Sequence, residues 1–266
     1  MEHCAGRWTG FAPTDMSRIA IIAAMEREVG PLIRSWKVRT LYQSGHAPPR
    51  YRLFEKGDAA LICGGMGPEA ARRAATVMIQ EVAPRRVVSV GFVGALDPAL
   101  KVADVLEPNI VINAKDGSRT ETGSGQGTLV SCAYVAGESQ KRKLREAYGA
   151  AVVDMEAAAV AQAAQARGIQ FGVLKAVSDE AEFPLPPMGD FLGEDGRFYS
   201  SRFALYVALR PRLWGATIAL ARNGVKASRA LCAAIEEYLR RETLPVELNL
   251  SARQPESAGG YIVEKR

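Results

Sequence analysis

The chain has 266 residues, of which 48% are hydrophobic and 24% are charged, so a globular core that needs no disulfide staples is expected. This length suits one decorated α/β domain. Four cysteines without a CxxC pair and only two histidines argue against a zinc site. The sequence has neither a signal-peptide pattern nor 18 consecutive apolar residues, so we expect a cytoplasmic protein without a membrane-spanning helix.

The formal net charge of +5 is concentrated in one region. Between Arg197 and Arg241 nine basic residues face two acidic ones, so this region carries +7 and the rest of the chain −2. The basicity therefore describes the partners of that region rather than the chemistry of the core. The region has no nucleic-acid-binding motif, and we expect no nucleic acid as a partner.

Short apolar runs alternate with helical patterns, which predicts an α/β fold: a single domain with a central mixed, mainly parallel sheet flanked by helices, plus a C-terminal helical extension. We divide the chain into a loose leader (1–17), the α/β domain (18–182), a helical, basic and apolar extension of the same domain (183–242) and a polar tail (243–266). The expected strands lie at 19–24, 51–55, 59–63, 87–90, 105–113, 152–153 and 171–177. The expected helices lie at 25–36, 69–81, 140–148, 154–167, 200–209, 212–222 and 225–241. Residues 64–67 and 91–96 are expected to be glycine loops, and 118–127 an exposed loop.

The segment from Gly65 to Ala70 matches G-x-G-x-x-A between a strand and a helix, which is the outline of a dinucleotide-binding turn. The acid that should end the following strand is missing, because that strand runs into Gly91 and Phe92. An oxidoreductase that binds a dinucleotide at this turn is therefore only an alternative. The other interpretation is a tight turn in which glycine allows close packing.

Ligands of open α/β sheets bind beyond the carboxyl ends of the strands. Four segments are expected there: 24–28, 64–67, 91–94 and 178–179. Glu28, Glu156 and Asp179 then gather at one edge, where their like charges repel unless a ligand or a proton is shared. Taken singly, each acid has a plainer interpretation, since helix N-termini favour carboxylates without any function.

Four blocks of sequence carry a family resemblance: 21–29 (IIAAMEREV), 64–67 (GGMG), 91–104 (GFVGALDPALKVAD), and 153–160 (VDMEAAAV) followed by 175–179 (KAVSD). In order and spacing they resemble the nucleoside phosphorylase/nucleosidase superfamily, and most of all its 5′-methylthioadenosine/S-adenosylhomocysteine nucleosidase branch. The resemblance covers about residues 18 to 182. It implies cleavage of a ribosyl–purine bond in a small-molecule nucleoside, without a metal or any other cofactor, in a homodimer.

The resemblance also implies roles for single residues. Glu28 matches the carboxylate that positions the attacking water, and Asp179 the acid that assists protonation of purine N7, so these are the candidate catalytic residues. Glu156 matches the carboxylate that holds the ribose hydroxyls, with Met155 packed under the sugar. The plainer alternatives are a surface acid for Glu28, an N-cap for Asp179 and a polar helix start for Glu156.

The remaining candidate substrate-binding residues come from the same blocks and from a weaker match at 131–135. Tyr134 matches the aromatic that stacks on the base, with Val135 offering backbone contacts, although Tyr134 as a core residue is nearly as good an interpretation. The other candidates are Met25, Gly67, Phe92, Gly94 and Ser178.

Hydrolysis and phosphorolysis differ in what fills the anion site. Phe92 stands where both branches commonly have a small hydroxyl residue, and no arginine lies between Val87 and Gly94. Arg27 lies in the first loop, but Glu28 beside it fits the water-using branch. A bulky apolar Phe92 disfavours a phosphate dianion, so we predict hydrolysis and keep a phosphorylase as the alternative. The same substitution leaves a non-catalytic nucleoside-binding protein open.

The extension after Asp179 departs from the small nucleosidases. Large apolar residues and basic residues are interleaved there, which suits helices packed on the sheet or on a dimer partner, or else an apolar lid or membrane-surface patch. The GMGP loop and this extension are similar to phosphorylase-like proteins linked to hopanoid biosynthesis. That resemblance implies an adenosyl-hopane-type lipid as substrate and a peripheral membrane contact through residues 197–241.

Overall fold

The structure is a computed structural model that describes residues 18–41, 51–193 and 195–243. The predicted leader at 1–17 and all but the first residue of the predicted tail at 243–266 lie outside the described residues. In chain order the elements are β1 (Ile19–Ala23), α1 (Glu26–Ile33), β2 (Lys37–Leu41), β3 (Tyr51–Lys56), β4 (Ala59–Cys63), α2 (Pro68–Val82), β5 (Arg86–Ala95), β6 (Val105–Leu106), β7 (Ile110–Asn113), β8 (Arg119–Glu121), β9 (Thr128–Ser131), α3 (Glu138–Tyr148), β10 (Val152–Asp154), α4 (Ala157–Gln165), β11 (Gln170–Asp179), η1 (Gly189–Phe191), α5 (Ser200–Ala208), η2 (Pro211–Leu213) and α6 (Trp214–Thr243).

One mixed sheet organises the domain, as the sequence predicts. Its strand order is β2-β3-β4-β1-β5-β10-β9-β7-β8, and β11 pairs with β5 and β6. The central strands β4, β1, β5 and β11 run parallel to one another. The outer strands β2 and β3 pair antiparallel with their neighbours, and so does the edge strand β8. The carboxyl ends of the buried central strands therefore meet at one edge, where ligands of such sheets bind.

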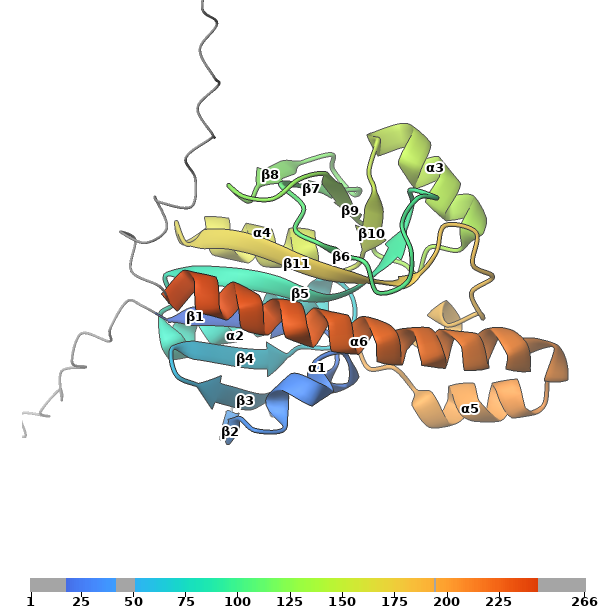
Figure 1. The fold of residues 1–266 in the computed structure, drawn as a ribbon, viewed down its shortest axis with the longest axis horizontal. Coiled ribbons are helices and arrows are strands. Elements are labelled where there is room, and N and C mark those ends of the chain that lie inside the picture. The colour runs from blue at the N-terminus through green and yellow to red at the C-terminus, as the bar shows by residue number, and fades with distance from the viewer. Residues whose placement is uncertain (1–17, 42–50, 194, 244–266) are drawn as a thin grey trace, which may run out of the picture.

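Helices cover both faces of the sheet (Figure 1). On one face α2 and α4 pack against each other and against the buried strands. On the other face α6 lies along β11 and β5 and contacts α1. The first part of α6 reaches beyond the sheet, with α5 folded back beside it, so the extension projects past the edge where the strands end.

The glycine loop predicted at 91–96 is wrong, because β5 continues through it to Ala95. Gly91 has φ +144°, and a Cβ there would lie 3.1 Å from Oε2 of Glu28. A Cβ on Gly94 would lie 2.9 Å from Cε of Lys141. The two glycines therefore leave space for buried side chains that approach the strand closely, which is a use of glycine inside a strand rather than in a loop.

Three other expectations are corrected. Residues 178 and 179 belong to β11, so Asp179 ends a strand and is not a helix N-cap. The helices predicted at 212–222 and 225–241 belong to one helix, α6. Gly224 faces the ring of Phe92, and a Cβ on Gly224 would lie 3.7 Å from Cε2 of that ring, which is an ordinary contact distance. The exposed loop predicted at 118–127 contains β8, which pairs with β7.

No helix in the described part of the chain has the length and hydrophobicity needed to cross a bilayer.

Candidate functional site

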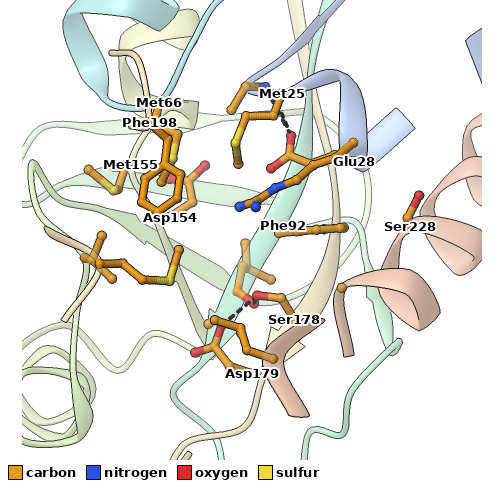
Figure 2. Close-up of a pocket in the computed structure, with 18 of the residues that line it drawn as sticks. Met25, Glu28, Met66, Phe92, Asp154, Met155, Ser178, Asp179, Phe198 and Ser228 are labelled. Atoms are coloured by element: carbon orange, nitrogen blue, oxygen red, sulfur yellow. Dashed lines mark hydrogen bonds between the residues drawn. The ribbon is translucent and has the colours of Figure 1, made fainter. Parts of the chain in front are cut away.

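A cavity of about 820 Å³ opens at the carboxyl ends of the central strands (Figure 2). All four segments that the sequence places there contribute to its wall, and so do α3, residues 153–156 from the end of β10 to the N-cap of α4, and the C-terminal extension. Cavities of roughly 300–1,000 Å³ are typical of small-molecule sites. This cavity therefore lies where the sequence predicts a ligand site.

Glu28 is buried in the first turn of α1, although its plainer interpretation was a surface acid. Its Oε2 accepts hydrogen bonds from the backbone N–H groups of Ala24 and Met25, both at 3.2 Å. Burial raises the pKa of Glu28, while the Met25 N–H and the charge of Lys175 pull it back. A carboxylate that is held in place and has a pKa above its ordinary value is suited to accept a proton.

A buried ion pair lies beneath this wall of the cavity. Lys175 of β11 is 1% exposed, and its Nζ lies 2.8 Å from Oδ2 of Asp154 and 3.1 Å from Oγ of Ser89. Asp154 also accepts a hydrogen bond from Ser131 and one from the N–H of Ala157 at 2.9 Å. The pair therefore ties β11 to β9 and to the start of α4.

Glu156 occupies the N-cap position of α4 and faces the glycine loop. Its Oε1 accepts a hydrogen bond from the N–H of Gly67 at 2.8 Å, and its Oε2 one from the N–H of Met155 at 3.2 Å. Burial, with the nearby charge of Asp154, raises the pKa of Glu156 to about 7, although Lys175 opposes the shift. Gly67 is thus used to hold a carboxylate, and Gly64 packs against α2, as the close-packing interpretation of this loop requires.

Asp179 and Ser178 lie at a register shift between β11 and β5. Such an irregularity redirects side chains at the end of a strand. Oγ of Ser178 donates to Oδ1 of Asp179 at 2.6 Å, and the ammonium of Lys141 donates to Oδ2. Both carboxylate oxygens of Asp179 are therefore held in place.

The structure places the remaining candidates on the cavity wall as well. Phe92 lies between Glu28 and Ser178 in the view of Figure 2. Tyr134 is 47% exposed, so its interpretation as a core residue is wrong, and it lines the cavity beside Val135. The other wall-lining candidates are Met25, Gly94 and Met155. Gly67 contributes through its hydrogen bond to Glu156.

Sequence reasoning missed three buried charged residues: Asp154, Lys175 and Lys141. Lys175 sits inside an apolar run, and a charge in a buried strand is a signal that was available. Lys141 lies in a polar helix among other charges, so nothing in the sequence distinguished it from a surface residue. No group of three or more His, Cys, Asp and Glu side chains suited to a metal ion occurs among residues 18–41, 51–193 and 195–243.

Comparison with known proteins decides the family. The sequence profile of the Phosphorylase superfamily matches residues 18–139 and 125–194, which is more than half of the chain. The chain belongs to the Phosphorylase superfamily. This matches the resemblance read from the sequence motifs.

Among curated relatives, aminodeoxyfutalosine nucleosidase of Campylobacter jejuni is 22% identical over 200 residues, which cover 62% of this chain and 87% of that protein. Among solved structures, the 5′-methylthioadenosine nucleosidase of Arabidopsis thaliana is 16% identical with a TM-score of 0.65, over 86% of this chain and 96% of that one. The 5′-methylthioadenosine/S-adenosylhomocysteine nucleosidase of Neisseria meningitidis, solved with methylthio-immucillin-A, is 19% identical with a TM-score of 0.61, over 85% and 99%.

These relatives support the predicted enzyme class, one that cleaves glycosidic bonds, and the fold confirms the predicted α/β architecture. The roles of single residues, the homodimer, the lipid-linked substrate and the membrane contact stay predictions.

The raised pKa of Glu156 gives a prediction about stability. Between the ordinary value of 4.5 and about 7, the folded chain binds more protons at this group than the unfolded chain, so the free energy of unfolding falls as pH rises. Glu156→Gln removes this loss and is expected to be more stable than wild type at pH 8, on the order of 1–3 kcal/mol, but not at pH 4. Urea unfolding at both pH values measures it. Exposed Glu121→Gln is the control, and a Glu156→Gln variant less stable than wild type at pH 8 contradicts the account.

Proposed function

We propose that the protein is an N-ribosyl hydrolase that cleaves the glycosidic bond of a 5′-substituted adenine nucleoside. The observation that carries the proposal is that Glu28, Glu156 and Asp179 face one cavity, each held by its own hydrogen bonds. The nucleosidase names of the relatives support it. Breaking a ribosyl–purine bond creates a cationic sugar, and fixed carboxylates around it stabilise that charge in the transition state.

Glu28 positions the attacking water. Two backbone N–H groups fix its Oε2, and its remaining lone pairs can accept a hydrogen bond from a water molecule. As the water attacks the anomeric carbon, Glu28 takes its proton. The burial that raises the pKa of Glu28 makes this carboxylate a better base than an exposed one.

Glu156 binds the ribose. Each of its oxygens accepts one backbone hydrogen bond, which leaves lone pairs for the ribose hydroxyls. Met155 beside it lines the cavity and presents an apolar surface to the sugar. Asp179 lies away from Met155 in Figure 2 and assists the departure of the purine. Tyr134 offers a ring on which the base can stack.

Water is a better acceptor than phosphate at this site. Phe92 takes up the wall between Glu28 and Ser178 with an apolar ring, which cannot solvate a dianion. A phosphate placed there would also meet the carboxylate of Glu28. Phosphorolysis is the second candidate, because Arg27 on the cavity wall offers a positive charge to a phosphate.

The extension gives the cavity an apolar side. Leu185, Met188, Phe198, Phe203, Leu220 and Val225 line it. Phe203 packs edge-on against Phe191 and tilted against Phe198, both with centroids 5.4 Å apart, so α5 is tied to the loop before it. This apolar side suits a large apolar 5′ substituent, of which an adenosyl-hopane-type lipid is an example, better than a charged one.

The outer surface of the extension supports a peripheral membrane contact. Leu209 is 72% exposed, and Leu205, Trp214 and Ile218 are also exposed, among the arginines of residues 197–241. Exposed apolar side chains flanked by basic ones suit an anionic bilayer surface. Flotation with anionic vesicles is expected to carry the wild type and not a Leu209→Ser/Trp214→Ser variant, and equal flotation of both would remove this contact.

The activity itself is tested by adenine release from methylthioadenosine, S-adenosylhomocysteine and an adenosyl-lipid analogue, with and without phosphate. Release is expected without phosphate. Glu28→Gln and Asp179→Asn are expected to lower kcat at least about 100-fold, since each removes a proton-transfer group. Glu121→Gln, an exposed acid outside the cavity, is the control and keeps full rate. Strict phosphate dependence would make the protein a phosphorylase, and no release from any substrate would contradict the proposal.

The apolar side of the cavity is tested with 5′-alkylthio adenosines of increasing chain length. Each buried methylene contributes about 0.8 kcal/mol, so kcat/KM is expected to rise about three- to fourfold per methylene. Phe203→Ser is expected to flatten that rise, whereas Leu209→Ser, outside the cavity, is not. A rate that falls with chain length in wild type would show that the site takes small substituents.

A further inference from the structure

A buried cation stands behind the leaving-group side of the cavity. Lys141 of α3 is 1% exposed and lines the cavity. Its Nζ donates to Oδ2 of Asp179 and to the carbonyl of Glu180 at 2.7 Å, and lies 3.5 Å from the carbonyl of Asp179. Burying an ammonium is costly unless it is paired, so a lysine in this place needs the carboxylate opposite it.

The strand beneath is shaped around this lysine. A Cβ on Gly94 would lie 2.9 Å from Cε of Lys141 and 3.0 Å from Oδ2 of Asp179. Any residue with a side chain at position 94 would therefore clash with the Lys141–Asp179 ion pair. Gly94, which the sequence marks only as a substrate-binding candidate, is the position that lets Lys141 and Asp179 meet.

The other charged groups near the Lys141–Asp179 pair form ion pairs of their own. The carboxylate of Glu180 lies 3.6 Å from Nζ of Lys101. On α3 itself, Arg145 lies 3.5 Å from Asp97. Tyr134 contributes a neutral ring to the same wall. Within the described residues, the carboxylate that faces Lys141 is that of Asp179, whose other oxygen accepts from Ser178.

We propose that Lys141 is a positioning residue for the leaving base, acting through Asp179; the inference rests on the proposed hydrolase activity. The ammonium of Lys141 gives a proton to the carboxylate of Asp179. As the bond from the anomeric carbon to the purine breaks, its electron pair passes into the base, and N7 takes that proton from the Asp179 carboxyl. Asp179 is then a carboxylate again, beside the neutral amine of Lys141. The amine regains a proton from water after the base departs.

The test compares two leaving groups in wild type and in Lys141→Met. One substrate is methylthioadenosine, and the other is a 4-nitrophenyl riboside with the same 5′-methylthio group, whose leaving group departs as a stable anion. Lys141→Met is expected to lower kcat at least about 100-fold on methylthioadenosine and less than about fivefold on the nitrophenyl riboside. Lys141→Arg keeps the cation but cannot release a proton, so it is expected to recover little of the loss on methylthioadenosine, and full recovery would overturn the proton transfer from Lys141. Lys143→Met, exposed on the same helix, is the control with unchanged kcat on both substrates.

Equal losses on both substrates would reduce Lys141 to a structural role, and no loss on methylthioadenosine would remove it from the reaction. Because Lys141→Met leaves a buried carboxylate unpaired, Lys141→Met/Asp179→Asn is measured as well. If Lys141 acts through Asp179, the double variant is no slower on methylthioadenosine than Asp179→Asn, and losses that multiply would overturn the inference. A wild type that cleaves neither substrate would instead contradict the proposed hydrolase, and a wild type active only on the nitrophenyl riboside would contradict the adenine assignment.

Discussion

Burial of charge at the carboxyl ends of the strands is the constraint on which the site depends. Glu28, Asp154, Glu156 and Lys175 interact electrostatically at one end of the sheet, where leaving any of them unpaired would cost several kcal/mol. Backbone N–H groups from three loops and one ammonium compensate them. The left-handed backbone at Gly91 and the N-cap position of Glu156 are consequences of the same arrangement. Hydrogen bonds within the protein thus hold the carboxylates of the site, which suits the electrostatic catalysis that we propose.

The sequence predicted the strands and helices where apolar periodicity is strong, such as β1, α2 and the β3–β4 hairpin. It also placed the three acids correctly at one edge, because topology alone brings strand ends together. It failed at 91–96, because glycine was read as a loop former although here it leaves room for Glu28 and Lys141. It failed to find Lys141 because a buried lysine in a polar helix is revealed only by its tertiary partner.

The C-terminal extension forms one side of the cavity. The second half of α6 packs on the sheet through a buried face that includes Leu231 and Ile235, so this half is part of the core. Its first turns and α5 project beyond the sheet and close one side of the cavity with apolar side chains. Under the proposed function, the charged end of the cavity carries the reaction and the apolar side takes the 5′ substituent, so that chemistry and specificity come from different segments of the chain.

The most direct test of the account is to run the reaction on methylthioadenosine in ¹⁸O-water containing phosphate and to analyse the sugar product by mass spectrometry. The account predicts free methylthioribose that carries one ¹⁸O at the anomeric carbon when it is trapped by immediate reduction, together with adenine. A sugar 1-phosphate without the label would contradict the role of Glu28 and place phosphate in the cavity.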